Sequence, residues 1–209
     1  MHDQGTGLNS DKGKVYIVDD DPLVRSSLEH TLASAGYEPE KFATASHFLG
    51  CLTPSHVGCV LADYRMPGMD GMALQEELTR RNSPLSVIII TGYPEVSLAV
   101  KAIQSGAINF IEKPFDRKTL LDDVATAIAK SRQRAVGLRA TKAFEERLAM
   151  LTDREREVAE QLVMGRTNRQ IAEHLGLSPR TVEIHRAHVM EKLEVANLID
   201  LARAVGNLH

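Results

Sequence analysis

The chain has 209 residues, of which 43% are apolar and 25% are charged, a composition typical of a soluble globular protein with one large domain or two ordinary ones. No apolar run approaches the roughly 20 residues that cross a bilayer, and Cys51 and Cys59 lack the spacing of a metal site or a disulfide framework. These features exclude a membrane-spanning protein and a disulfide scaffold, and they favour a cytoplasmic protein in a reducing environment.

The net charge of -3 is distributed unevenly along the chain. Residues 1–130 contain 12 Lys and Arg against 17 Asp and Glu, whereas residues 147–209 contain 9 of each kind. The C-terminal part is therefore less acidic than the N-terminal part but is not basic. Bulk charge alone gives no indication of a nucleic-acid partner.

Residues 1–13 are polar and Gly-rich, and we expect a flexible N-terminus rather than a signal peptide. Residues 14–130 then alternate short apolar runs with helical patterns, and the central runs are apolar without alternation, as in strands covered on both faces. This succession predicts an α/β domain with a doubly wound parallel sheet of five strands. We expect the flavodoxin-like strand order 2-1-3-4-5, which would place the first, third, fourth and fifth strands side by side. The predicted strands are Lys14–Asp19, Glu40–Thr44, Gly58–Asp63, Leu85–Thr91 and Asn109–Lys113.

Capping residues mark the helices of this domain. Asp21 can cap the first helix, with Pro22 at its first position, and Asp116 can cap the fifth. Gly106 follows the fourth helix at a position where helices commonly end. The apolar residues expected on the buried faces are Val24, Leu28, Leu32 and Ala35 in the first helix and Leu120, Val124 and Ile128 in the fifth.

Residues 131–146 are polar, carry four basic residues and contain Gly137, so we expect a linker or a helical extension there. The strand pattern ends at this point, and residues 147–209 predict an all-α domain of four helices joined by short turns. Each helix start carries a capping residue. These starts are the capping boxes Thr152 with Glu155 and Thr167 with Gln170, then Ser178 with Pro179, and Asn197.

Polar residues stand at the ends of four predicted strands. Asp19 and Asp20 follow the first strand, Asp63 ends the third, Thr91 ends the fourth and Lys113 ends the fifth. In the order 2-1-3-4-5 these strand ends lie side by side at the ligand-binding edge of the sheet. A single Asp after a strand is more often a helix cap or a turn residue. We expect this for Asp21, which can cap a helix, and for Asp70–Gly71, which resembles a turn. Five such residues at one edge of the sheet instead indicate a functional site.

The chemistry of this set is that of phosphoryl transfer. Three neighbouring carboxylates repel one another unless a cation compensates them, and oxygen ligands with room for water suit Mg²⁺. A carboxylate can attack phosphorus to give an aspartyl phosphate. Lys113 would then supply a fixed positive charge and Thr91 a hydroxyl donor for the phosphoryl oxygens.

Over residues 14–130 the chain resembles the receiver domain of two-component response regulators. The resemblance lies in Val18–Asp20, Asp63–Gly71, Ile90–Gly92 and Lys113–Phe115. It implies that Asp63 accepts the phosphoryl group, that Asp19 and Asp20 are the acidic pair, and that Lys113–Pro114 is a cis peptide. It further implies Mg²⁺ ligands at Asp20, Asp63 and the Arg65 backbone carbonyl, phosphoryl binding by Thr91 and Lys113, and Phe110 as the switch aromatic. A core position in the fifth strand is an equally good interpretation of Phe110.

Two other classes of protein are alternatives for this half. A phosphatase of the haloacid-dehalogenase kind needs an Asp-x-Asp pair after the first strand, whereas Asp19 and Asp20 are adjacent and the candidate nucleophile lies on the third strand. A dimer scaffold that works without phosphate would not need the complete acidic set. Turnover of a phosphate ester would support the first alternative, and failure to bind Mg²⁺ would support the second.

The third C-terminal helix has one narrow apolar face, formed by Val182, Val189 and Leu193, that should be buried. Ile184 and Ala187 lie on the opposite face, where apolar residues are unexpected unless the face meets thymine methyl groups in a DNA major groove. Arg180, Glu183 and Glu191 share that face, with Thr181 and His188 at its edge. With the preceding helix and the turn at Gly176, this is a helix-turn-helix pattern. A small bundle that docks a protein through Ile184 is the alternative.

Residues 147–209 resemble the LuxR-type output domain, and the run Thr181–Leu193 is most similar to the FixJ branch of the NarL/FixJ regulators. The resemblance rests on Leu151–Val158, Asn168–Ala172 and Ser178–Arg186. It maps base contacts to Glu183, Ile184 and Ala187. Independently of the resemblance, Arg180 on the same face could reach a phosphate or guanine. Positions expected to contact phosphates or set the register are Asn168, Arg169, Thr181, Arg186 and Lys192. Region 4 of sigma factors has a similar fold, but a preceding receiver argues against it.

Together the two resemblances imply a transcription regulator whose receiver catalyses only its own phosphorylation and dephosphorylation and is otherwise no enzyme. The implied partners are a sensor histidine kinase, promoter DNA and a second copy of the chain after phosphorylation, with RNA polymerase as a further candidate. We expect the receiver to change its surface around residues 97–106 and 109–113. The stimulus, the target promoters and the sign of regulation do not follow from the sequence.

Overall fold

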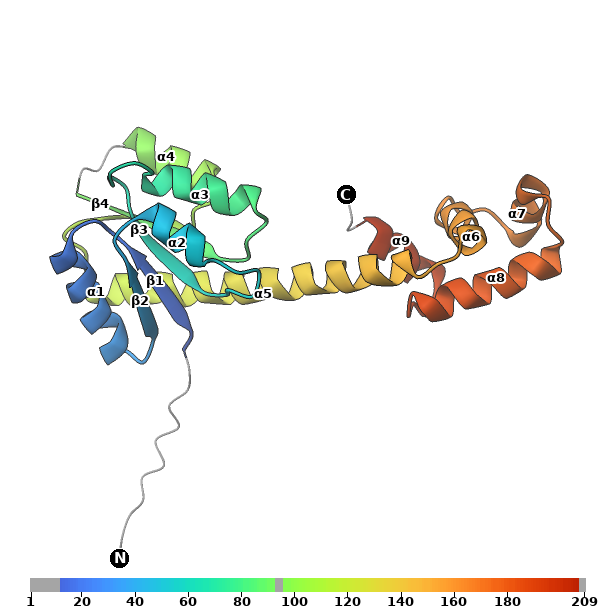
Figure 1. Cartoon of the computed structure of the whole chain (residues 1–209), viewed down its shortest axis with the longest axis horizontal. Helices are drawn as coiled ribbons and strands as arrows, with labels where there is room; N and C mark the ends of the chain where they lie inside the picture. The colour runs from blue at the N-terminus through green and yellow to red at the C-terminus, as the bar shows by residue number, and fades with distance from the viewer. Residues whose placement is uncertain (1–11, 93–95, 207–209) are drawn as a thin grey trace, which may run out of the picture. The chain divides into compact units, whose positions relative to one another are not determined.

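The computed structural model describes residues 12–92 and 96–206, and the side chains of 96–99 are outside the description. The chain divides into two compact units, with the division between Ala135 and Val136 (Figure 1). Each unit has its own apolar core and is considered by itself. No helix in the described part of the chain is long and apolar enough to span a membrane.

The N-terminal unit contains a five-stranded parallel sheet in the order β2-β1-β3-β4-β5, which confirms the predicted topology. The central strands β1, β3 and β4 are buried along almost their whole length, in agreement with their unbroken apolar sequences. The strands are β1 (Lys14–Val18), β2 (Glu38–Phe42), β3 (Cys59–Asp63), β4 (Ser86–Thr91) and β5 (Asn109–Glu112).

The predicted start of the second strand was wrong by two residues. β2 begins at Glu38, not at Glu40, and includes Pro39. A proline cannot donate to a neighbouring strand, but β2 is an edge strand, where this is tolerated. The chain enters β2 through Gly36, whose φ of 85° suits glycine. The strand also ends two residues before the predicted Thr44, at Phe42, whereas the boundaries of the other four strands agree with the prediction to within one residue.

Successive strand residues point to opposite faces of the sheet, and helices cover both faces. Val15 and Ile17 pack with α1 (Pro22–Ser34) and α5 (Arg117–Ala149), through Leu28, Leu32, Leu120 and Val124. Tyr16 and Val18 belong to the core on the other face, which receives α2 (Ala45–Cys51), α3 (Gly71–Arg80) and α4 (Val96–Gln104). Asp21 and Asp116 cap α1 and α5 as predicted, since each side chain accepts a backbone N–H of the first turn.

The helix α5 is continuous from Arg117 to Ala149, so residues 131–146 are helical. Ser131 is fully buried in the N-terminal unit, where its hydroxyl accepts the N–H of Gly58 at 2.9 Å. Phe144 is buried in the core of the C-terminal unit. Between them, Val136 and Leu138 are exposed.

The C-terminal unit carries four further helices, as predicted. Both capping boxes are present, and Ser178 caps the third of these helices with Pro179 in its first turn. Their apolar faces meet in one core that includes Val158, Leu162, Ile171 and Leu201. The helices are α6 (Asp153–Val163), α7 (Asn168–Leu175), α8 (Pro179–Lys192) and α9 (Leu198–Gly206).

Candidate acidic site and nucleic-acid interface

The carboxyl ends of β1, β3 and β5 bring Asp19, Asp63 and Lys113 together. The ammonium nitrogen of Lys113 lies 2.9 Å from Asp19 Oδ2 and 2.5 Å from Asp63 Oδ1. Asp19 is 2% exposed and Asp63 is 9% exposed, so both carboxylates face a largely dry site. One lysine therefore bridges two buried acids, which would otherwise repel each other.

Backbone groups fix the remaining carboxylate oxygens. Asp63 Oδ2 accepts the N–H of Arg65 at 2.8 Å, and Asp19 Oδ1 accepts the N–H of Asp21 at 2.8 Å. The N–H of Lys113 donates to the carbonyl of Thr91 at 2.7 Å, which ties the end of β5 to the end of β4. The Lys113–Pro114 peptide is cis, as the resemblance implied.

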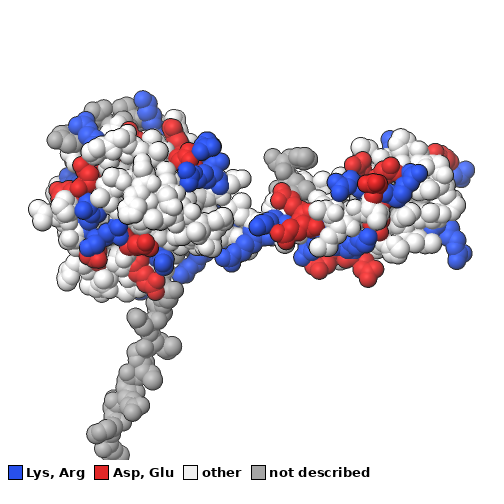
Figure 2. Space-filling view, viewed as in Figure 1, with Lys and Arg blue, Asp and Glu red and all other residues white. Residues whose placement is uncertain are grey.

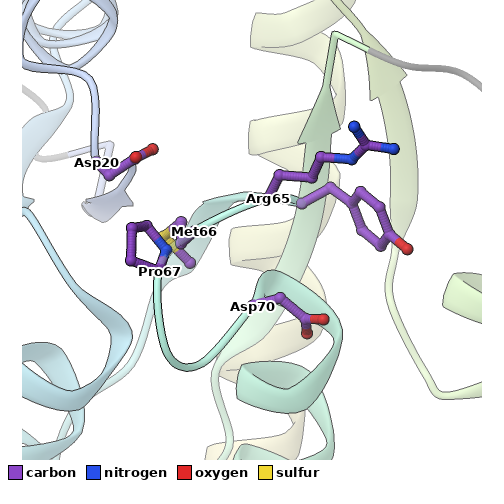
Figure 3. A pocket seen from close by; sticks show the side chains of 6 residues that line it. Asp20, Arg65, Met66, Pro67 and Asp70 are labelled. Atoms are coloured by element: carbon purple, nitrogen blue, oxygen red, sulfur yellow. The ribbon is translucent and has the colours of Figure 1, made fainter.

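Asp20 is exposed, and across the described ranges its carboxylate has no hydrogen-bond or ion-pair partner. It lines an open hollow of about 480 Å³ together with Arg65, Met66 and Pro67, from the loop after β3 (Figure 3). Asp70 lines the same hollow, but its side chain caps α3 by accepting the N–H of Ala73 at 2.7 Å. Among the described residues at this edge, Asp20 thus carries the free carboxylate.

Gly71 is a site residue whose role the sequence did not reveal beyond a turn. It is the first residue of α3, and a Cβ built there would lie 2.6 Å from the carbonyl oxygen of Asp63. Only glycine lets α3 begin this close to the acceptor strand. A glycine eight positions after the last residue of the strand carries no local signal for this, because the close contact depends on the fold.

Burial and charge act against each other in this site. Burial raises the pKa of Asp19 above its usual range, more than the hydrogen bond from Lys113 lowers it. Burial alone would lower the pKa of Lys113, but its hydrogen bonds to Asp63 and Asp19 outweigh this effect and the pKa is raised. Lys113 therefore remains a cation at neutral pH.

The donor set fits a hard divalent cation. No cluster of three or more His, Cys, Asp or Glu side chains with metal-binding geometry occurs within residues 12–92 and 96–206. The expected ligand set, Asp20, Asp63 and the Arg65 carbonyl, contains two side chains and one backbone oxygen and leaves the other positions to water and phosphate, as Mg²⁺ prefers. Asp20 is free to contribute, and Asp63 has its second oxygen held by Arg65 N.

The other two predicted residues of this half occupy different environments. Thr91 is 1% exposed at the end of β4. Phe110, on β5, is partly buried and packs against the core on the face covered by α2, α3 and α4. Of the surface expected to change, around residues 97–106 and 109–113, the side chains of 97–99 lie outside the described residues.

In the C-terminal unit, α8 has the two faces that its sequence predicted. Val182, Val189 and Leu193 are fully buried. On the opposite face Ile184 is 51% exposed, and Arg180, Glu183, Ala187 and Glu191 are exposed beside it. An exposed Ile between charged residues gives this face a mixed apolar and polar surface of the kind that reads base edges.

The residues predicted to contact phosphates differ in their surroundings. Arg186 of α8 donates to Asn168 Oδ1 of α7 at 3.3 Å, so these two candidates lie side by side. Thr181 contacts the capping Ser178, and Arg169 lies 3.4 Å from Glu173 on the same helix. On the visible face of this unit, Lys and Arg are interspersed with Asp and Glu rather than gathered in one patch (Figure 2).

Lys192 is engaged within the domain, a contact that the sequence did not suggest. Its ammonium nitrogen lies 2.6 Å from Oε2 of Glu155, a residue of α6 that is 4% exposed. The same oxygen accepts the N–H and the hydroxyl of Thr152, and His188 lies 3.7 Å from the other oxygen. The hydrogen bond from Lys192, followed by that from the Thr152 backbone, lowers the pKa of Glu155 to about 2.

Comparisons with known proteins agree with both halves of this description. Residues 15–125 match the response regulator receiver domain, and residues 149–205 match the luxR family of bacterial regulatory proteins. The chain is 40% identical to the transcriptional regulatory protein FixJ of Bradyrhizobium diazoefficiens, with 92% of this chain and 94% of FixJ covered. It is 35% identical to the response regulator protein TodT of Pseudomonas putida, covering 97% and 91% of the two chains.

Solved structures give the same result. The structure of the response regulator StyR superposes with a TM-score of 0.76 at 38% identity, covering 93% of this chain and 98% of StyR. Full-length FixJ from B. japonicum has a TM-score of 0.58 at 38% identity, with 95% and 98% covered. The chain therefore belongs to the response regulators that join a receiver domain to a LuxR-type helix-turn-helix, in the FixJ-like branch, and it is a DNA-binding transcription regulator with a histidine kinase as its partner.

Proposed function

We propose that a sensor histidine kinase phosphorylates this regulator on Asp63. A carboxylate oxygen of Asp63 forms a bond to phosphorus while the bond between phosphorus and the kinase imidazole breaks, and the imidazole nitrogen keeps the electron pair. The observation that carries the proposal is the placement of Lys113 Nζ within 2.5 Å of Asp63 and 2.9 Å of Asp19. This fixed cation can neutralise charge on a transferring phosphoryl group without reorganisation.

Asp20, Asp63 and the Arg65 carbonyl would hold Mg²⁺, which supplies charge neutralisation for the phosphoryl oxygens when bound. Asp20 supports this role because its carboxylate is exposed and unpaired among the described groups. Asp19 completes the acidic pair by holding Lys113 rather than by facing the hollow. Thr91 and Lys113 would bind the phosphoryl oxygens.

The receiver would catalyse its own phosphorylation and dephosphorylation and no other reaction. In the phosphorylated state, Thr91 would move toward the phosphate and Phe110 would turn inward. The partly buried position of Phe110 supports this, since the ring has room to become more buried. The changed surface around residues 97–106 and 109–113 would then support a homodimer.

In the dimer, two copies of α8 would enter the major groove about one helical turn of DNA apart. Glu183, Ile184 and Ala187 would contact base edges, with Arg180 at a phosphate or guanine. Asn168, Arg169, Thr181, Arg186 and Lys192 would contact phosphates or set the register, and Lys192 would do so beside its ion pair with Glu155. RNA polymerase is a further proposed partner, and DNA as the target would place the regulator in the cytoplasm.

We also propose functional boundaries for the chain. Residues 14–130 would form the receiver, 131–146 the connecting helical extension, and 147–209 the DNA-binding domain, while residues 1–11 of the predicted N-terminal segment 1–13 lie outside the described residues. The change of packing partners along α5, from Ser131 in one unit to Phe144 in the other, supports these limits.

The test is phosphorylation of the full chain by acetyl phosphate and Mg²⁺, followed by analytical ultracentrifugation and a band shift. The wild type should take up one phosphoryl group, dimerise and bind DNA more tightly. Asp63→Asn should take up none and remain in the unphosphorylated state, with Asp70→Asn as the control that still labels. Persistent labelling of Asp63→Asn would show that another residue accepts the phosphoryl group. Equal dimerisation and equal DNA affinity of the phosphorylated and unphosphorylated wild type would contradict control by phosphorylation.

A further inference from the structure

Arg25 reaches back from α1 to the loop that carries the acidic pair. Its guanidinium Nη1 donates to the backbone carbonyl of Asp19 at 2.6 Å. Its backbone N–H donates to the carbonyl of Asp21 at 3.1 Å, which is an early hydrogen bond of α1. Main chain and side chain of one residue therefore hold the loop on both sides of Asp20.

The Asp19 carbonyl needs such a donor because of its position in the sheet. The N–H of Asp19 still pairs with Phe42 O at 3.2 Å, but both β1 and β2 end at this point. With the charged donor of Arg25, every polar group of Asp19 is engaged, since its carboxylate accepts from Asp21 N and Lys113 Nζ. A hydrogen bond from a charged donor to a partly buried carbonyl is stronger than one between neutral groups, so it restrains the conformation of the loop effectively.

The position of Asp20 depends more on the hydrogen bond from Arg25 to the Asp19 carbonyl than the positions of its neighbours do. Its carboxylate has no protein partner in the described ranges, so the placement of its backbone is the main constraint that the protein puts on it. The peptide between Asp19 and Asp20 is the one whose carbonyl Arg25 holds. The guanidinium also adds positive charge beside the acidic cluster, in addition to Lys113, which contacts Asp19 and Asp63.

We infer that Arg25 is a positioning residue for the cation site. It orients the peptide before Asp20, so that this carboxylate is aimed at the cation before the cation arrives, and it offsets part of the negative charge. This inference rests on the proposed Mg²⁺ site. Arg25 touches neither the phosphoryl group nor the cation and acts through the backbone of Asp19.

The experiment follows the Arg65 amide of the full, unphosphorylated chain by ¹H–¹⁵N NMR during titration with MgCl₂. Residues that orient metal ligands typically change metal affinity by 10–100-fold when replaced, so Arg25→Met should weaken Mg²⁺ binding by about 10-fold or more. Arg25→Lys keeps the charge and one donor and should recover part of the affinity. Lys41→Met is the matched control, because Lys41 pairs with Glu29 of α1 away from the site and should leave the affinity unchanged.

Thermal unfolding of the same variants without Mg²⁺ separates positioning from general stability. If Arg25→Met lowers only the unfolding temperature and binds Mg²⁺ as the wild type does, the inference is overturned while the cation site stands. If Arg25→Met does not fold, the Mg²⁺ affinity of Arg25→Lys tests the inference instead. An affinity equal to that of the wild type would contradict it, because it would show that the guanidinium geometry is not needed. If the wild type itself shows no Mg²⁺-dependent shift that Asp20→Asn removes, the proposed cation site fails and the inference with it.

Discussion

Lys113 Nζ contacts Asp63 Oδ1 and Asp19 Oδ2 at the same time, so its ion pair with Asp19 holds the ammonium group next to Asp63. The side chain is about three-quarters covered, with 24% of it exposed, and it cannot move far without losing one of the two ion pairs. Asp19 therefore aims Lys113 at the acceptor. This relationship separates the roles of the two members of the acidic pair, because Asp20 makes no such contact.

Replacing Lys113 should slow phosphoryl transfer much more than it weakens the fold. Lys113→Met removes the fixed charge from the transition state, and loss of such a preorganised group typically costs about 10²-fold in rate. The rate of uptake from acetyl phosphate at saturating Mg²⁺ measures the effect. Lys130→Met, an exposed lysine of α5, serves as the control. A rate for Lys113→Met within twofold of the wild type would contradict the role assigned here.

Gly71→Ala should destabilise the receiver and disturb the acceptor strand. The added Cβ would meet the Asp63 carbonyl at 2.6 Å, and both groups belong to backbone that is packed on all sides. Overpacking of this kind costs about 1–3 kcal/mol. Urea unfolding gives the free energy, and Gly50→Ala in α2, which meets nothing within 4 Å, should be neutral or slightly stabilising. Equal stability of the two variants would show that α3 can shift freely at its start.

The pKa of Glu155 predicts an acid transition in the C-terminal unit. Its folded value of about 2 lies below the ordinary 4.5, so Glu155 contributes stability that is fully present above pH 4.5 and is lost as the pH falls to about 2. The unfolding midpoint of this unit in urea should fall across that window. Lys192→Met removes the largest cause of the shift and should make the fall shallower, with Lys142→Met on α5 as the control. A wild-type midpoint that does not change from pH 4.5 to 2 would exclude Glu155 as a source of stability.

Local sequence signals predicted those parts of the molecule that local chemistry determines. The caps at Asp21, Thr152 and Thr167 were predicted correctly because a short side chain bonds a backbone N–H two or three residues away. The parallel, doubly wound sheet followed from the succession of apolar strands and helices, and its order 2-1-3-4-5 was expected as the one that would bring the polar strand ends together. The start of β2 was missed because Pro39 argues against a strand unless the strand is known to be an edge.

Long-range contacts could not be predicted in the same way. The residue types of the acidic site were predicted, but the hydrogen bond from Lys113 to Asp19 joins residues 94 positions apart. The pairing of Lys192 with Glu155 spans 37 positions and gives Lys192 a structural role that its place beside the DNA-facing surface did not suggest. The contact of Gly71 with Asp63 O requires the orientation of α3 against β3. Each depends on the packing of two elements, which a pattern along the chain does not contain.

The exposed face of α8 makes the sharpest prediction for DNA binding. Ile184 is 51% exposed on this face, and if it meets a thymine methyl group, Ile184→Ala should weaken binding to a duplex selected with the wild type from a randomised pool. Glu183→Gln should act differently. It loses the charged acceptor for a cytosine amino group, so discrimination at one base pair should fall by about 1–3 kcal/mol. Because the change also removes a negative charge near the DNA, affinity for other sequences should rise. Ile199→Ala removes an isoleucine that is 70% exposed on α9 and is the matched control for Ile184. Band shifts on the selected duplex and on single-base variants give both quantities. Equal losses for Ile184→Ala and Ile199→Ala, with unchanged base preference in Glu183→Gln, would place the DNA contacts on another face of the domain.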